Sequence, residues 1–350
     1  MSTLEEALAT RNRLSEYHVY HEGEEHIRIT PYLNLKKELG YNKKKDEDRA
    51  NDYARVHQRS DESNSYFIHR PVLLFHDTPR TLRRGSQKNG DPLCIIHSSA
   101  FWREWSIQFV PNLSDIVDPR GVVGWEYRTK PDNSTSNDER ALKGHKVRSW
   151  RVWGETGKRY HQMVNTRRNR WEEEDFQPAR ADEVVRLKWS SPFINPRRYH
   201  FCYAGITFFW VGTRDLHEDE KWSRRLLPLH HLKLVAEIPG KPRLFLAQFT
   251  SDFSSKKFGK LWIFDSSVSK LLETVDSFQG TDGSEFELGV KSRTVFADIR
   301  ETRVYELIMA TAMCMVVGEW QKRMTLWFIL MLISVSGKGM NMTGAGGGGC

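Results

Sequence analysis

Histidines are the side chains of this chain with the most obvious capacity for catalysis or metal binding, and their spacing argues against both. His230 and His231 are adjacent on a predicted strand, so they point to opposite faces and cannot bind one metal ion together. His18, His21 and His26 surround a run of glutamates, but a charged segment of this kind provides no preorganised ligand set. The sequence also lacks the motifs of phosphate loops, zinc proteases and serine hydrolases. We therefore expect no metal, no cofactor and no enzymatic activity.

Three pairs of adjacent basic residues form the candidate binding site. These are Arg197 with Arg198 before a strand, Arg224 with Arg225 in a polar loop, and Lys256 with Lys257 between two strands. Loops on a rigid scaffold often carry binding residues, and phosphate groups are commonly bound by arginine and lysine. The hypothesis is that these side chains converge on the head groups of anionic phospholipids. The alternative is that they are ordinary solvated charges, which are common on protein surfaces.

The charge of the whole chain also favours anionic partners. Its 350 residues carry a formal net charge of +8, which suits a membrane surface, an acidic protein or nucleic acid. A strand that binds nucleic acid usually interleaves aromatic with basic residues. The aromatic run 208–210 is instead flanked by Thr207 and Val211. This local pattern argues against nucleic acid and leaves an anionic membrane surface or another protein as the expected partner.

An apolar helix near the C-terminus must be enclosed by something. Residues 307–317 are apolar or small on every face, whereas a surface helix of a soluble protein has a polar back. We place this helix near residues 296–323 and predict that it lies in the core. A second apolar run, 324–335, is shorter than the about 17 residues that a membrane-spanning helix needs. The residues expected to face the core are Leu307, Ile308, Thr311, Ala312, Met315 and Val316.

Strand patterning dominates the chain before this helix. Residues 199–213 are long enough for two strands that turn at Ala204 and Gly205, and residues 147–164 predict a hairpin. A series of strands that ends in one enclosed helix predicts a mainly β fold, a closed antiparallel barrel around an apolar C-terminal helix. The other predicted strands include residues 93–96, 102–110, 184–189, 232–238, 244–250 and 261–264.

Composition sets the expected boundaries of this barrel. Residues 1–65 are highly charged and predict a disordered or short-helical arm, residues 66–335 predict the barrel, and residues 336–350 predict a disordered Gly-rich tail. Three cysteines, Cys94, Cys202 and Cys314, lie in apolar runs and are expected to be buried free thiols. No two cysteines have the spacing of a zinc site, and this usage suits a reducing compartment.

The combination of these features resembles the tubby C-terminal superfamily, which includes tubby domains, plant LURP-one-related proteins and phospholipid scramblases. The resemblance is carried by Trp150-Arg-Val-Trp-Gly-Glu-Thr-Gly-Lys-Arg-Tyr160, by Phe201-Cys-Tyr-Ala-Gly-Ile-Thr-Phe-Phe-Trp-Val-Gly212 and by the enclosed helix. The chain is also similar to fungal barrel proteins of this type. The resemblance covers about residues 66–323 and implies a closed barrel threaded by its C-terminal helix.

The resemblance also implies what the barrel would do. Tubby domains bind phosphoinositides, so we expect a non-enzymatic, cytoplasmic barrel that binds anionic phospholipid at the membrane periphery through its basic loops. One alternative is a protein-interaction scaffold, and another is a membrane-anchored protein that uses residues 304–335. Glu319, Lys322 and Arg323 interrupt that apolar segment, which makes a single membrane span costly. A third alternative is an enzyme or carrier with a pocket in the barrel.

Overall fold

The computed structural model describes most of the predicted barrel. The described residues are 14–23, 26–38, 42, 47, 51, 64–71, 78–99, 103–118, 121–124, 127, 138–143, 158, 162, 179–191, 195–213, 231–252, 256–279 and 299–339.

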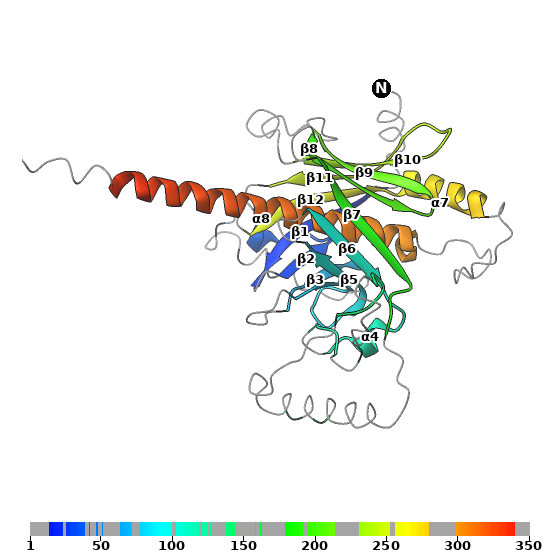
Figure 1. Cartoon of the computed structure of the whole chain (residues 1–350), viewed down its shortest axis with the longest axis horizontal. Helices are drawn as coiled ribbons and strands as arrows, with labels where there is room; N and C mark the ends of the chain where they lie inside the picture. The colour runs from blue at the N-terminus through cyan, green and yellow to red at the C-terminus, as the bar shows by residue number, and fades with distance from the viewer. Residues whose placement is uncertain are drawn as a thin grey trace, which may run out of the picture.

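Twelve antiparallel strands close into one barrel (Figure 1). Each strand pairs with its neighbours in sequence, and β12 pairs with β1 to close the ring. Closure removes the unpaired edges that an open sheet would expose. The strands are β1 (Leu14–Glu22), β2 (His26–Thr30), β3 (Tyr66–His69), β4 (Arg80–Arg84), β5 (Asp91–Ser98), β6 (Glu104–Phe109), β7 (Glu183–Ser191), β8 (Asn195–Tyr203), β9 (Ile206–Thr213), β10 (His231–Glu237), β11 (Leu244–Ser251) and β12 (Lys257–Phe264).

Alternating side chains build the barrel wall as the sequence predicts. In β6, Trp105, Ile107 and Phe109 are buried, and they alternate with polar residues. The predicted turn between β8 and β9 is confirmed, since Ala204 and Gly205 have φ values of 48° and 74°. Positive φ at both central residues of a two-residue hairpin matches the twist of the paired strands.

The prediction of a disordered or short-helical arm over residues 1–65 is wrong for its described part. Strands β1 and β2 both lie within it, and β1 pairs with β2 and β12. Tyr17 and Val19 are buried and alternate with Glu16 and His18, which is a strand pattern in a charged segment. The charges dominate the composition, but they lie on the outer face, where they do not oppose burial of the inner face.

The C-terminal helix is longer than predicted. Helix α8 (Arg303–Gly339) has 37 residues and a length of about 55 Å at about 1.5 Å per residue. It begins later than residue 296 and continues through the second apolar run, so residues 304–335 belong to one helix. Residues 336–339, placed in a disordered tail by their composition, are helical as well. Further helices with described bounds are η2 (Leu35–Lys37), α4 (Leu113–Ile116), α7 (Asp265–Gln279) and η6 (Ile299–Glu301).

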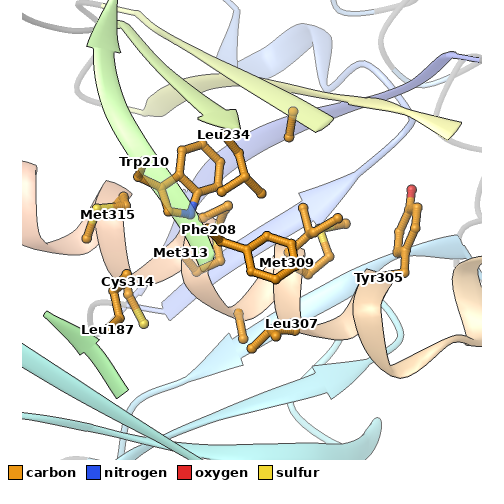
Figure 2. Packing of buried hydrophobic residues seen from close by; sticks show 14 of the residues in the cluster. Leu187, Phe208, Trp210, Leu234, Tyr305, Leu307, Met309, Met313, Cys314 and Met315 are labelled. Atoms are coloured by element: carbon orange, nitrogen blue, oxygen red, sulfur yellow. The ribbon is translucent and has the colours of Figure 1, made fainter. Parts of the chain in front are cut away.

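The first half of α8 belongs to the same buried cluster as residues from the strands (Figure 2). The Nε1–H of Trp210 in β9 donates a hydrogen bond to Thr311 Oγ1 over 3.1 Å. The hydroxyl groups of Tyr17 in β1 and Tyr305 in α8 are 2.9 Å apart. All six helix residues predicted to face the core are buried: Leu307, Ile308, Thr311, Ala312, Met315 and Val316.

Two further sequence predictions differ from the structure or lie outside it. The hairpin over residues 147–164 falls outside the described residues except for Lys158 and Gln162, and both of these are helical. Cys94 and Cys314 are buried as predicted, but Cys202 is exposed. Cys202 lies between Phe201 and Tyr203 in β8. Successive residues of a strand point to opposite faces, so the thiol points outward although its neighbours in sequence are apolar.

Candidate functional site at the barrel rim beside Trp320

Helix α8 passes one end of the barrel at residues 318–320. The ring of Trp320 lies 5.5 Å from the ring of His21 in β1 and 6.1 Å from that of Phe258 in β12. Gly318 faces Trp105, near the start of β6. We call this end of the barrel, where β1 ends and β6 and β12 begin, the α8 rim.

Strand parity places at this rim the strand ends between which the three predicted basic pairs lie in sequence. Because consecutive strands are antiparallel, every odd-numbered strand ends at the α8 rim and every even-numbered strand begins there. The connections from β7 to β8, from β9 to β10 and from β11 to β12 therefore start and finish at this end. Each of these connections, or the start of the strand after it, carries one pair: Arg197 with Arg198, Arg224 with Arg225, and Lys256 with Lys257.

The structure shows that Lys257 is not available to a ligand in solution. Its side chain is 3% exposed, and its Nζ lies 2.8 Å from Glu38 and 3.4 Å from Asp252. Burial alone would raise the pKa of Glu38, but hydrogen bonds from Lys257 and Tyr20 outweigh that effect and lower it. The prediction that Lys257 binds a head group is therefore wrong, because an internal carboxylate already neutralises it.

The remaining predicted basic residues differ in what the structure describes. Lys256 is exposed at the α8 rim. Arg198 is partly buried, and its guanidinium carbon lies 4.2 Å from the centroid of the Phe209 ring, on the outer wall. Arg197 lies in β8, but its side chain is outside the described residues, as are Arg224 and Arg225. Of the six predicted side chains, Lys256 is therefore the one that the described part of the rim exposes.

The N-terminal histidines are ordered residues of the barrel wall. His21 stacks on Phe258 with ring centroids 3.5 Å apart, and its pKa is lowered to about 4 by burial and by Lys37. His26 lies against His69, with ring centroids 4.8 Å apart. Within the described ranges, no three His, Cys, Asp or Glu side chains are grouped closely enough to hold a metal ion. His231 is buried in β10, and His230 lies outside the described residues.

Beyond the rim, the second half of α8 exposes large apolar side chains. Figure 1 shows this part of the helix, in red, projecting past the strands. The exposed positions are distributed over several sides of the helix, so they form more than a narrow stripe. We call residues 324–335 the apolar extension. Its large exposed side chains are Met324 (48% exposed), Phe328 (53%), Ile329 (45%), Met331 (43%), Leu332 (51%) and Ile333 (61%).

The apolar extension is the feature that the sequence interpretation underestimated. Residues 324–335 are apolar, but Glu319, Lys322 and Arg323 interrupt the apolar pattern and favour a helix that ends near residue 323. The signal that identifies one continuous helix is the absence of Gly and Pro from residues 319–335. No helix in the described ranges is long and apolar enough to cross a membrane.

Comparison of the chain with known protein families, with curated proteins and with solved structures finds no match.

Proposed function

We propose that this protein is a non-enzymatic, tubby-like barrel that attaches to a membrane through its C-terminal helix. In this proposal the barrel encloses the first half of α8, and the apolar extension inserts into one leaflet. Basic residues of the α8 rim then lie at the level of the lipid head groups. The proposal combines the expected lipid binding with the alternative of a membrane anchor, because both features occur at the same end of the barrel.

The observation that carries this proposal is the exposed apolar surface of the extension. Fully burying one large apolar side chain is worth about 1.5 to 3 kcal/mol. Six such side chains, each roughly half exposed, therefore represent on the order of 5 to 9 kcal/mol of unfavourable hydration. A contiguous apolar surface of this kind marks a membrane or protein contact.

The dimensions of the extension fit one leaflet. Residues 324–335 span about 18 Å, against a hydrocarbon core of about 30 Å for a whole bilayer. Lys322 and Arg323 precede the extension in sequence, at the position where basic side chains commonly reach the head groups. Exposed Lys256 adds a further positive charge at the same rim.

Vesicle flotation tests the attachment. The full chain is mixed with neutral vesicles or with vesicles that contain an anionic phosphoinositide, at low and at high salt. We expect flotation with both kinds, and stronger flotation with anionic vesicles at low salt, because only the head-group contribution is screened. The double variant Phe328→Asn/Leu332→Asn should lose flotation with both kinds of vesicle.

A matched control lies on the same helix. Thr325 and Ser334 are also exposed in the extension, so Thr325→Asn/Ser334→Asn changes the same helix without removing apolar surface and should float like the unmodified chain. Protein that ignores all vesicles, or that floats equally well with the Phe328 and Leu332 variant, would exclude this mode of attachment. Vesicle-independent self-association that disappears in that variant would instead favour the protein-interaction scaffold.

A further inference from the structure

The outer wall of the barrel carries a second basic surface, on strands β7 to β10. It consists of Lys188 in β7, Arg198 and His200 in β8, Phe209 in β9 and Lys233 in β10. Lys188 is exposed, and the other four side chains are partly exposed. We call these five residues the β7–β10 patch.

Strand register places the patch residues next to one another. His200 is paired with Lys188 on one side and with Phe209 on the other. Arg198 and Lys233 are both paired with Val211. Phe209 therefore has His200 beside it and Arg198 and Lys233 on its diagonals, which are within reach of long side chains.

Aromatic and cationic groups are in contact within the patch. The Arg198 guanidinium lies over the Phe209 ring at 4.2 Å, and the rings of His200 and Phe209 are 6.3 Å apart. The buried Nε of Arg198 has no hydrogen-bond acceptor among the described residues. Stacking on the ring holds the guanidinium while leaving its second planar face free of that ring.

Neighbouring carboxylates do not neutralise the patch. Glu104 is paired in register with Lys188, but its carboxylate lies 3.4 Å from Arg186. Glu237, further along β10, pairs with Arg243. In the part of the chain that the structure describes, Lys188, Arg198 and Lys233 form no ion pair. The positive charges act on a neighbouring group, because Lys188 and Arg198 add to burial in lowering the pKa of His200.

We infer that the β7–β10 patch binds single-stranded nucleic acid, with its cations on phosphates and with bases stacked on Arg198 and His200. Proteins that bind single strands of any sequence use basic residues along the sugar-phosphate backbone of the nucleic acid. They also use planar side chains on which any base can stack. Aromatic and basic residues do not alternate along residues 207–211, but strand pairing places them next to one another across β7 to β10. This inference does not rest on membrane attachment, because the patch lies on the barrel wall.

Fluorescence anisotropy with a labelled oligothymidylate and with a duplex of similar length tests the inference. The full chain is used in one mild detergent throughout, over a range of salt concentrations. The double variant Lys188→Glu/Lys233→Glu should weaken oligothymidylate binding by about tenfold or more at low salt and reduce the salt slope by about 1.4, the value for two lost phosphate contacts on a single strand.

A control variant separates the patch from net charge. Lys88, in the turn after β4, and Lys270, in α7, are exposed, so Lys88→Glu/Lys270→Glu changes the total charge equally and should bind like the unmodified chain. Arg198→Lys keeps the charge but removes the planar group, so it should weaken binding about fivefold or more with an unchanged salt slope.

Three results would overturn the inference. These are equal weakening by the two double variants, unchanged binding by Arg198→Lys, and a preference for the duplex. Patch variants that lose anionic vesicles while keeping the oligonucleotide would also overturn it, because they would assign the surface to lipid.

Discussion

At the scale of single residues, a partly buried histidine at the α8 rim links stability to pH. The His21 ring packs against Phe258 and Trp320, and its pKa is lowered from 6.5 to about 4, mainly by burial and also by Lys37. The lowered value means that the unfolded chain binds this proton more readily than the folded barrel does. The stability contributed by neutral His21 is therefore complete above pH 6.5 and decreases as the pH falls toward 4.

The variant His21→Phe should flatten this pH dependence, because phenylalanine keeps an aromatic ring against Phe258 and Trp320 but does not titrate. Urea denaturation at pH 7, 6 and 5 measures the effect. The unmodified chain should lose more free energy of unfolding between pH 7 and 5 than the variant does, by at most about 1.4 kcal/mol per pH unit for one proton. Identical pH profiles would show that His21 does not contribute.

At the scale of elements, an ionic contact fastens η2 to the barrel wall. Lys257 at the start of β12 contacts Glu38, which directly follows η2, and Tyr20 of β1 donates its hydroxyl hydrogen to the same carboxylate over 2.6 Å. Lys37 of η2 also lies 2.7 Å from Glu22 in β1. These contacts hold η2 and Glu38 against β1 and β12.

A double-mutant cycle on Lys257→Met and Glu38→Gln should measure a coupling energy well above that of an exposed pair. The matched control is Lys260 with Glu16, which joins β12 to β1 at 3.4 Å but has side chains that are 25% and 39% exposed. Exposed pairs usually contribute about 0.2 to 1 kcal/mol, whereas the burial of Lys257 makes loss of one partner more costly. Equal coupling in the two cycles would contradict a fastening role.

At the scale of the whole molecule, α8 divides into a part that packs and a part that does not. Residues 304–317 are buried, with exposures of 7% or less, whereas the described side chains of the apolar extension are exposed. The two halves have similar apolar composition, so composition does not explain their different environments. Contact with the strands accounts for the burial of the first half, and the second half lies beyond them (Figure 1).

Truncation after Arg323 should therefore leave the barrel folded. We expect a thermal midpoint within a few degrees of the full chain and an unchanged near-ultraviolet circular dichroism spectrum, because the removed side chains lie outside the core. Truncation after Thr302 is the contrasting variant, and it should abolish cooperative unfolding by removing the helix part of the core cluster. Loss of cooperative unfolding in the shorter truncation as well would contradict this division of α8.

The sequence by itself determined the features that depend on local periodicity. Three features follow from the types of neighbouring residues, and the structure agrees with each. They are the alternation in β6, the turn at Ala204 and Gly205, and the apolar character of residues 307–317. Alternation was also present in β1, at Tyr17 and Val19, but the surrounding charges concealed it. Local pattern therefore indicated a mainly β fold ending in a buried helix.

Only the tertiary structure decided which distant residues meet. Lys256 and Lys257 are adjacent and look equivalent in sequence, yet one is exposed and the other is neutralised by Glu38 from the far end of the chain. Phe209 has no basic neighbour along its strand, yet register places Arg198 over its ring. Strand register and the order of strands in the barrel determine these contacts, because they fix which side chains share a face across hundreds of residues.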